Sequence, residues 1–243
     1  MLKKIVIGII VLGVAAYWIA AVTVLNKPEK GMVCDGVEIM INDSLQTGFL
    51  QENDILNLLK KEKIDPVGLK MEQIDLNKIE SCLLKNKYIE QITCYKTPGG
   101  KVCLEVSQRC PILHVMSANG DNYYLDRHGK QMPKSSYAAH LVVVTGRVTP
   151  DFARKNLMIL GRFIADDPFW RQQIQQINVL ESGNVELIPL VGEHIIYLGS
   201  PTNIQNKLDR MKKFYTEGLN KAGWNKYSMV NLEYDNQIIC KKK

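Results

Sequence analysis

Residues 88–111 read "YIEQITCYKTPGGKVCLEVSQRCP" and decide the fold of the first half of the chain. Two runs of alternating apolar and polar residues, Ile89–Lys96 and Lys101–Gln108, flank the sequence "TPGG". Proline presets the backbone for a tight turn, and glycine tolerates the positive φ that such turns require. Two alternating runs around such residues predict a β-hairpin.

Two cysteines lie within this predicted hairpin, one on each strand. A two-residue turn at Pro98-Gly99 would place Cys94 opposite Cys103, with Cβ atoms about 4.5–5.5 Å apart. A disulfide needs Cβ atoms about 3.8 Å apart and an oxidising compartment. The spacing therefore predicts an adjacent pair, Cys94 and Cys103, and leaves open whether the two sulfurs are bonded.

One strand and two helices are predicted before the hairpin. Val33–Ile41 alternates as a strand, and "FLQENDILNLLKKEK" places acids in the first turn of a helix and lysines in the last, as the helix dipole favours. A second helix is expected from Asn77, with Glu80 three residues later forming a capping box. The order strand, helix, helix, strand, strand predicts a small α/β unit over residues 33–110.

The second half, residues 111–240, is predicted to be β-rich with flanking helices, which makes the whole fold class α+β. Thr149 and Pro150 mark a helix start, as N-cap and first helical residue. Gly223 is placed to end a long helix that begins near Asn203. The predicted strands are Ile112–Met116, Asn122–Leu125, Leu141–Thr145, Ile174–Leu180, Val185–Ile188 and His194–Leu198.

The last predicted strand is "VNLEYDNQIIC", residues 230–240, which precedes a basic tail at 241–243. Alternate residues from Val230 to Cys240 are mostly apolar, and those between them are mostly polar. That two-residue period is typical of a half-buried strand. The final strand is either an interior strand or a sheet edge with unpaired backbone groups that a partner can use.

The N-terminus carries a stretch that is long enough to cross a membrane. Residues Ile5–Leu25 contain 21 uncharged residues, which as a helix would measure about 31 Å. A cleaved signal peptide is the alternative, but its apolar region would be shorter and would end at a cleavage site with small residues. We expect an uncleaved transmembrane helix at 5–25, a cytoplasmic stub at 1–4 and a linker at 26–32.

The composition and the motifs argue against several other classes of protein. A net charge of +6, spread among acidic residues, does not form the basic patch of a nucleic-acid binder. The four histidines are scattered, and there is no phosphate-binding or nucleophile-elbow motif. Tyr124, Asp126 and His128 could be arranged as acid and base, but "DRHG" supplies the residues of a turn. We expect no catalytic residue, metal, cofactor or small-molecule substrate.

The order of these pieces resembles the FtsQ/DivIB family of bacterial cell-division proteins. "FLQENDILNLL" resembles the first helix of that family's POTRA unit, and "NKYIEQITCYKTPGGKVCLEVSQRCPI" resembles its hairpin and the junction that follows. "YYLDRHGKQMP" resembles the hairpin that opens the family's β domain, and "YSMVNLEYDNQI" resembles its penultimate strand. The resemblance covers nearly the whole chain.

The resemblance implies a non-enzymatic, single-pass scaffold of type II orientation in the inner membrane, with most of the chain in the periplasm at the division septum. It would link early septal-ring proteins to the FtsB–FtsL coiled-coil pair and to septal peptidoglycan synthesis. In the family a partner strand adds to the last strand of the β domain. Carried over, the partner-binding residues are Leu232, Tyr234, Asp235 and Asn236. Glu233 stands where the family often has arginine, which implies a differently charged partner.

Two other functions fit some of these features less well. A POTRA-type assembly or transport factor would carry several POTRA repeats or a transmembrane barrel, and the sequence contains neither. A membrane-anchored envelope enzyme would need a pocket with convergent titratable residues.

Overall fold

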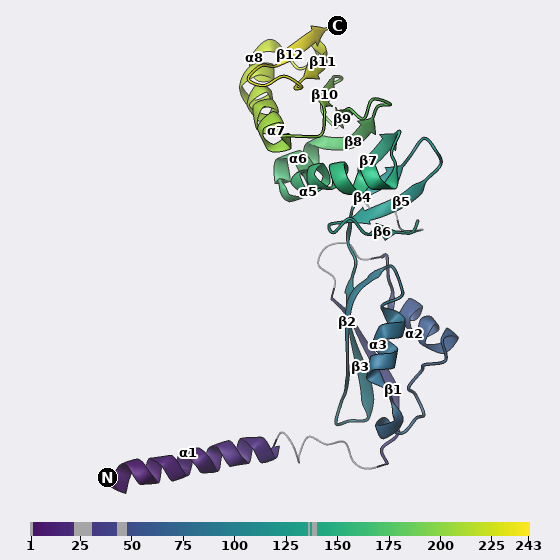
Figure 1. Cartoon of the computed structure of the whole chain (residues 1–243), viewed down its shortest axis with the longest axis vertical. Coiled ribbons are helices and arrows are strands. Elements are labelled where there is room, and N and C mark those ends of the chain that lie inside the picture. Colours follow the sequence, from purple (N-terminus) through teal and green to yellow (C-terminus); the bar gives the residue numbers. More distant parts are fainter. Residues whose placement is uncertain (1, 22–30, 43–47, 136, 138–139) are drawn as a thin grey trace. The chain divides into compact units, whose positions relative to one another are not determined.

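The computed structural model describes residues 2–21, 31–42, 48–135, 137 and 140–243. Beyond the N-terminal helix, these residues form two compact units, of which unit 1 ends at Gln108 and unit 2 begins at Arg109 (Figure 1). Each unit has its own hydrophobic core.

The N-terminal helix α1 spans Leu2–Ala20 and consists largely of apolar residues. Within the described residues, no helix combines the length and the apolar character needed to cross a membrane. Residues 22–25 of the predicted transmembrane segment lie outside the described residues. The membrane anchor at 5–25 therefore stays a prediction.

Unit 1 has the predicted order of strand, helix, helix, strand and strand. Its three-stranded sheet has the order β1-β3-β2, in which β1 pairs parallel with β3 and β3 pairs antiparallel with β2. The strand β1 begins three residues later than predicted, because Val33 makes only an isolated bridge with Lys70. The elements are β1 (Gly36–Asn42), α2 (Glu52–Lys61), a 3₁₀ turn η2 (Met71–Gln73), α3 (Leu76–Leu83), β2 (Ile89–Lys96) and β3 (Lys101–Gln108).

The N-terminus of helix α3 differs from the prediction. Its N-cap is Asp75, whose carboxylate accepts a hydrogen bond of 3.1 Å from the N–H of Lys78. Glu80 does not cap the helix, and its carboxylate instead accepts a hydrogen bond of 2.7 Å from the N–H of Cys94. The predicted capping box at Asn77 and Glu80 is therefore wrong, because tertiary packing gives Glu80 a partner in the sheet.

The hairpin of β2 and β3 is confirmed, but its predicted register is wrong by one residue. Thr97 N–H donates to the carbonyl of Lys101, and Gly100 adopts a φ of 79°, so the loop has three residues rather than two. Cys94 therefore lies opposite Leu104, and Cys103 lies opposite Tyr95. A one-residue slip moves side chains to the other face of a sheet.

The two cysteines consequently point to different faces and are not bonded to each other. Cys94 belongs to the core of unit 1, where burial raises the pKa of its thiol to about 12. Cys103 donates a long hydrogen bond of 3.7 Å to the carboxylate of Glu38 on the opposite face. The prediction of adjacent Cys94 and Cys103 side chains fails for this reason.

Unit 2 is built on a nine-stranded mixed sheet with the order β12-β11-β10-β9-β8-β7-β4-β5-β6. The predicted strands are present, most with ends shifted by one residue. They are β4 (Pro111–Met116), β5 (Asn122–Asp126), β6 (Gln131–Met132), β7 (Val142–Gly146), β8 (Ile174–Val179), β9 (Val185–Pro189), β10 (Ile195–Gly199), β11 (Tyr227–Asn231) and β12 (Ile239–Lys242).

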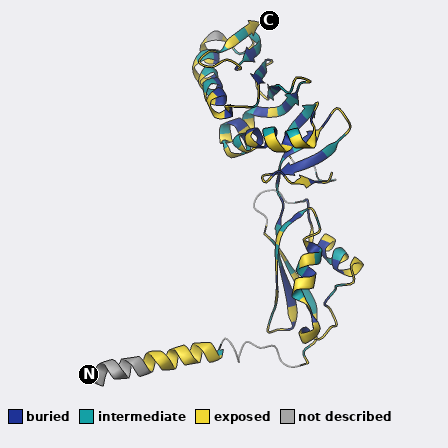
Figure 2. Ribbon diagram, in the orientation of Figure 1, coloured by how far each residue is buried: buried dark blue, intermediate teal, exposed yellow. Residues whose placement is uncertain are grey.

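Helical segments pack against this sheet and share one core with it, so their outer faces are exposed and their inner faces are buried (Figure 2). The predicted cap is confirmed, because the Thr149 hydroxyl accepts a hydrogen bond of 3.2 Å from Phe152 N–H. Trp170 is fully buried within this core. The segments are α4 (Pro150–Phe152), a π-helical turn η3 (Ala153–Leu157), α5 (Met158–Asp166), α6 (Pro168–Gln173), α7 (Ile204–Lys213), a second π-helical turn η4 (Phe214–Leu219) and α8 (Asn220–Ala222).

Candidate partner-binding edge

The C-terminal residues form a strand hairpin rather than the single strand that the alternating pattern predicts. Strand β11 pairs parallel with β10 and antiparallel with β12, so it is an interior strand. A loop, residues 232–238, joins β11 to β12. The predicted continuous strand over residues 230–240 is therefore wrong, because Asn236 takes a left-handed conformation with a φ of 62°.

The outer side of β12 is a sheet edge, since β12 stands last in the strand order of unit 2. Lys243 N–H donates to the carbonyl of Lys226, which continues the pairing of β12 with β11. Backbone groups of an antiparallel strand alternate between its two sides. The backbone groups of Cys240 and Lys242 consequently face the open side, where they are available to an added strand.

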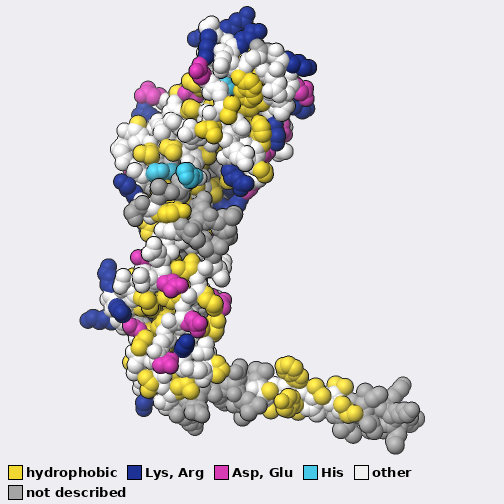
Figure 3. All heavy atoms as spheres, turned by 180° about the vertical axis from the view of Figure 1, so that it is seen from behind, with side chains coloured by type: hydrophobic (Ala, Val, Ile, Leu, Met, Phe, Trp, Pro, Cys, Tyr) yellow, Lys and Arg dark blue, Asp and Glu magenta, His cyan; other side chains and the backbone are white. Residues whose placement is uncertain are grey.

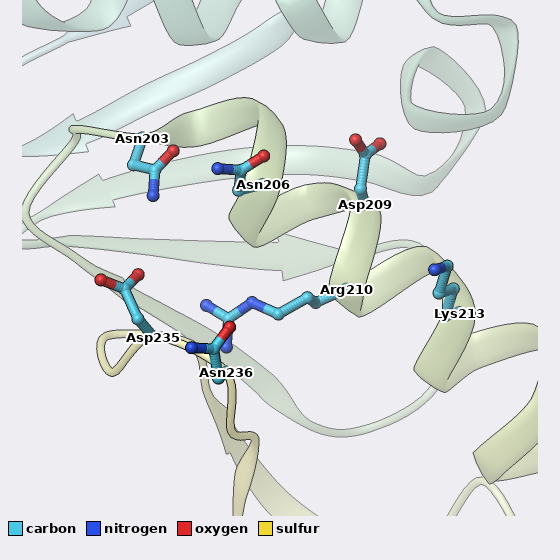
Figure 4. A pocket seen from close by; sticks show the side chains of 7 residues that line it. All are labelled: Asn203, Asn206, Asp209, Arg210, Lys213, Asp235 and Asn236. Carbon is cyan, nitrogen blue, oxygen red and sulfur yellow. The ribbon is translucent and has the colours of Figure 1, made fainter.

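Arg210 on α7 holds the loop beside this edge. Its guanidinium donates hydrogen bonds of 2.8, 2.6 and 3.0 Å to the carbonyls of Tyr234, Gln237 and Leu232. Figure 4 shows the side chain extending from the helix toward the loop residues Asp235 and Asn236. The guanidinium of Arg210 thus donates hydrogen bonds to three carbonyl groups that lie outside the strand pairing. These bonds fix the path of the loop between β11 and β12.

The four predicted partner-binding residues all lie on this loop but differ in accessibility. Leu232 is fully buried, and its N–H donates to the carbonyl of Tyr197, which extends the pairing with β10. Tyr234 is half exposed, and Asp235 and Asn236 are exposed. The structure therefore makes Leu232 an anchor of the loop and leaves the other three at the surface. Whether they contact a partner stays a prediction.

A buried lysine, Lys207 on α7, binds the backbone at the end of β10, next to this loop. Lys207 donates hydrogen bonds of 2.9 and 2.8 Å to the carbonyls of Leu198 and Ser200, at the end of β10. Burial lowers the pKa of Lys207, and the carboxylates of Glu233 and Asp235 partly offset that effect. The acidic side chains of the loop, Glu233 and Asp235, are thus close enough to attract the charge of Lys207 on α7.

A polar cleft of about 610 Å³ lies between α7 and the loop, and amide, carboxylate and basic side chains line it. Its only basic groups are Arg210, which is engaged with carbonyls, and Lys213. Among the described residues, no cluster of His, Cys, Asp or Glu could hold a metal ion. The cleft is lined by Asn203, Asn206, Asp209, Arg210, Lys213, Asp235 and Asn236.

Of Tyr124, Asp126 and His128, the structure shows most clearly the contacts of Asp126. Asp126 is buried and pairs with Arg109 at 2.5 Å, while its other oxygen accepts hydrogen bonds from the N–H groups of His128 and Lys130. This carboxylate therefore holds the turn between β5 and β6.

Basic residues surround the candidate edge. Lys241 and Lys242 belong to β12, and Lys243 pairs with Glu193. Figure 3 shows lysine and arginine side chains gathered at the end of unit 2 where the chain terminates. Lysines on an edge strand discourage indiscriminate pairing with other strands, and they favour a partner that carries acidic residues.

Sequence reasoning missed Arg210 and Ile239. Arg210 contacts residues more than 20 positions later in the chain, and no short spacing signals such a contact. Ile239 is 46% exposed at the start of β12, so the edge strand presents an apolar side chain as well as backbone groups. The adjacent residues Ile238 and Ile239 interrupt the alternating pattern, and this interruption could have indicated that a separate strand begins there.

Comparison with known proteins agrees with this architecture. Residues 32–107 match the model of a POTRA-like domain, and residues 110–241 match the model described as FtsQ/DivIB, C-terminal related. No curated protein matches the chain. Both families consist of non-enzymatic scaffold domains. Because the second model covers more than half of the chain, the protein belongs to the FtsQ/DivIB family of cell-division proteins.

Proposed function

We propose that this protein is a bitopic membrane scaffold of the bacterial divisome that binds the FtsB–FtsL coiled-coil pair by accepting a strand at β12. Through that pair it links early septal-ring proteins to septal peptidoglycan synthesis. The apolar residues 5–25 anchor it in the inner membrane, and units 1 and 2 lie in the periplasm at the septum. Membership of the family supports the cell-division role.

The single observation that carries the binding mode is the outer edge of β12, the last strand of the sheet. Four residues form this strand, and half of their backbone groups face outward. Each added backbone hydrogen bond stabilises a complex by only about 0.5–1.5 kcal/mol. Side chains such as Tyr234 and Ile239, and confinement of both proteins to one membrane, supply the remaining affinity.

A pair of substitutions at Lys242 tests the binding mode. Lys242→Pro removes an N–H that faces the open side, without removing a hydrogen bond to β11, whereas Lys242→Ala removes only the side chain. We expect Lys242→Pro to weaken binding to the purified coiled-coil pair about tenfold, because one backbone bond is lost and the added strand is displaced. Lys242→Ala measures how much the charge of this side chain contributes to binding.

Equal binding by Lys242→Pro and Lys242→Ala would contradict strand addition at β12. The cell-division role itself is tested separately, by the position of a fluorescent fusion in dividing cells. We expect the signal at the septum, and a uniform envelope signal would contradict that role.

A further inference from the structure

One end of unit 1 exposes three apolar side chains on adjoining segments. Val33, Val67 and Leu69 are 47%, 50% and 46% exposed. Two backbone hydrogen bonds of 2.8 Å, from Cys34 N–H to the carbonyl of Leu69 and from Gly68 N–H to that of Cys34, join the two segments. Figure 3 shows hydrophobic side chains at the surface of this end of unit 1. We call Val33, Val67 and Leu69 the apolar tip.

The backbone of the apolar tip is held firmly. Asp65 accepts a hydrogen bond of 3.1 Å from Val67 N–H, and Leu69 N–H closes a turn on the carbonyl of Pro66. Gly68 supplies the positive φ, 84°, that this turn requires. Turns at protein surfaces usually carry small polar residues. In this turn two large apolar side chains, Val67 and Leu69, are instead about half exposed, and an apolar neighbour would remove them from water.

The position of the apolar tip in the chain points to a membrane surface as its neighbour. The apolar N-terminal run ends at Leu25, and the described residues begin again at Gly31. Six residue steps span at most about 22 Å, even when fully extended. The tip begins two residues after Gly31, so the surface of any membrane that holds residues 5–25 lies within reach of it. A short tether also raises the effective concentration of the tip at that surface.

We propose that the apolar tip inserts into the outer leaflet of the membrane in which residues 5–25 are anchored. Lys70, adjacent to Leu69, and Lys101, next to Gly100, are exposed at the same end of the unit and are suited to anionic headgroups. The contact fixes which end of unit 1 faces the bilayer and which end points away. This inference rests on the membrane anchor of the proposed function.

Tryptophan fluorescence of the full chain in phospholipid vesicles tests the inference. Leu69→Trp places a fluorophore in the tip, and Leu84→Trp is its matched control. Leu84 is a leucine of the same unit with similar exposure, 48%, after the end of α3. Leu84 precedes the start of β2, whereas the tip adjoins the turn at the other end of β2. A strand of eight residues is about 26 Å long. The vesicles carry either ordinary or brominated acyl chains, and bromine quenches only fluorophores that reach it.

We expect the fluorescence added by Leu69→Trp to be quenched by brominated chains and shifted to shorter wavelength, and that added by Leu84→Trp to be unaffected. If neither added signal is quenched, or if both are, the insertion of the apolar tip is refuted. The parent protein reports the anchor independently, because Trp18 lies within residues 5–25. Brominated chains should quench the parent, and Trp18→Phe should remove that quenching. A parent that is not quenched refutes the anchor itself.

Discussion

Removal of the Arg210 side chain should release the loop beside β12. In Arg210→Ala, three backbone carbonyls, those of Leu232, Tyr234 and Gln237, lose their donor. Three hydrogen bonds at about 0.5–1.5 kcal/mol each, discounted because two of them are exposed to solvent, contribute about 2 kcal/mol to the order of the loop. That free energy corresponds to a factor of about 30 in the opening equilibrium.

Hydrogen exchange followed by mass spectrometry measures this effect directly. The amides of Leu232 and Glu233, which donate to the Tyr197 carbonyl and to the Asn231 side chain, should exchange about 30-fold faster in Arg210→Ala than in the parent. Affinity for the coiled-coil pair should fall in parallel, because the loop must be ordered again when the partner strand binds. Exchange in unit 1 should be unchanged.

Lys213→Ala is the matched control. Lys213 lies one helical turn further along α7 and lines the same cleft, so its loss changes the net charge equally. If Lys213→Ala and Arg210→Ala accelerate exchange by the same factor, the effect is one of charge, and the argument from the three carbonyl contacts is refuted.

Three further predictions follow from other residues. Asp126→Ala removes the buried carboxylate that pairs with the Arg109 guanidinium, so the free energy of unfolding should fall by about 3–5 kcal/mol. A loss below about 1 kcal/mol in urea titrations would contradict this. Burial lowers the pKa of His194 below its ordinary 6.5, so the unfolded state binds more protons and stability should decrease as pH falls through 6.5. That slope should be smaller in His194→Gln, and equal slopes would refute the assignment. Tyr234→Lys should weaken co-purification with the coiled-coil pair while Tyr234→Phe preserves it, and unchanged binding in Tyr234→Lys would remove this residue from the interface.

The elements of both units were predictable where a local pattern matched a local cause. Helix α2 combined an apolar stripe with acids at its start and lysines at its end, and the structure has all three. The hairpin of β2 and β3 followed from "TPGG" between two alternating runs. Thr149 and Pro150 marked the start of α4 because both act through their own backbone positions.

The errors occurred where a distant residue or a single backbone conformation decided the outcome. Gly100 in the left-handed conformation added one residue to the hairpin loop and separated Cys94 from Cys103. Glu80 left its helix for the N–H of Cys94. The left-handed Asn236 and the contacts of Arg210 with three loop carbonyls turn the chain between β11 and β12, in the middle of an alternating run. None of these contacts has a signature in the spacing of neighbouring residues.

The placement of the site residues shows the same division. The C-terminal segment was identifiable as a pairing segment, yet its residues are distributed over an interior strand, a clamped loop and an edge strand. The edge that carries the proposed function begins at Ile239, after the four residues that the resemblance implied. Only the strand order of the whole sheet establishes which side of which strand is open.

The central claim is that the outer side of β12 receives a strand of another protein. Amide hydrogen exchange of Cys240 and Lys242, resolved by NMR in the free protein and in its complex with the coiled-coil pair, tests it most directly. The amides of both residues should exchange slowly only in the complex, because each N–H then donates to the partner strand. If the complex forms and both amides still exchange as fast as in the free protein, strand addition at β12 is contradicted.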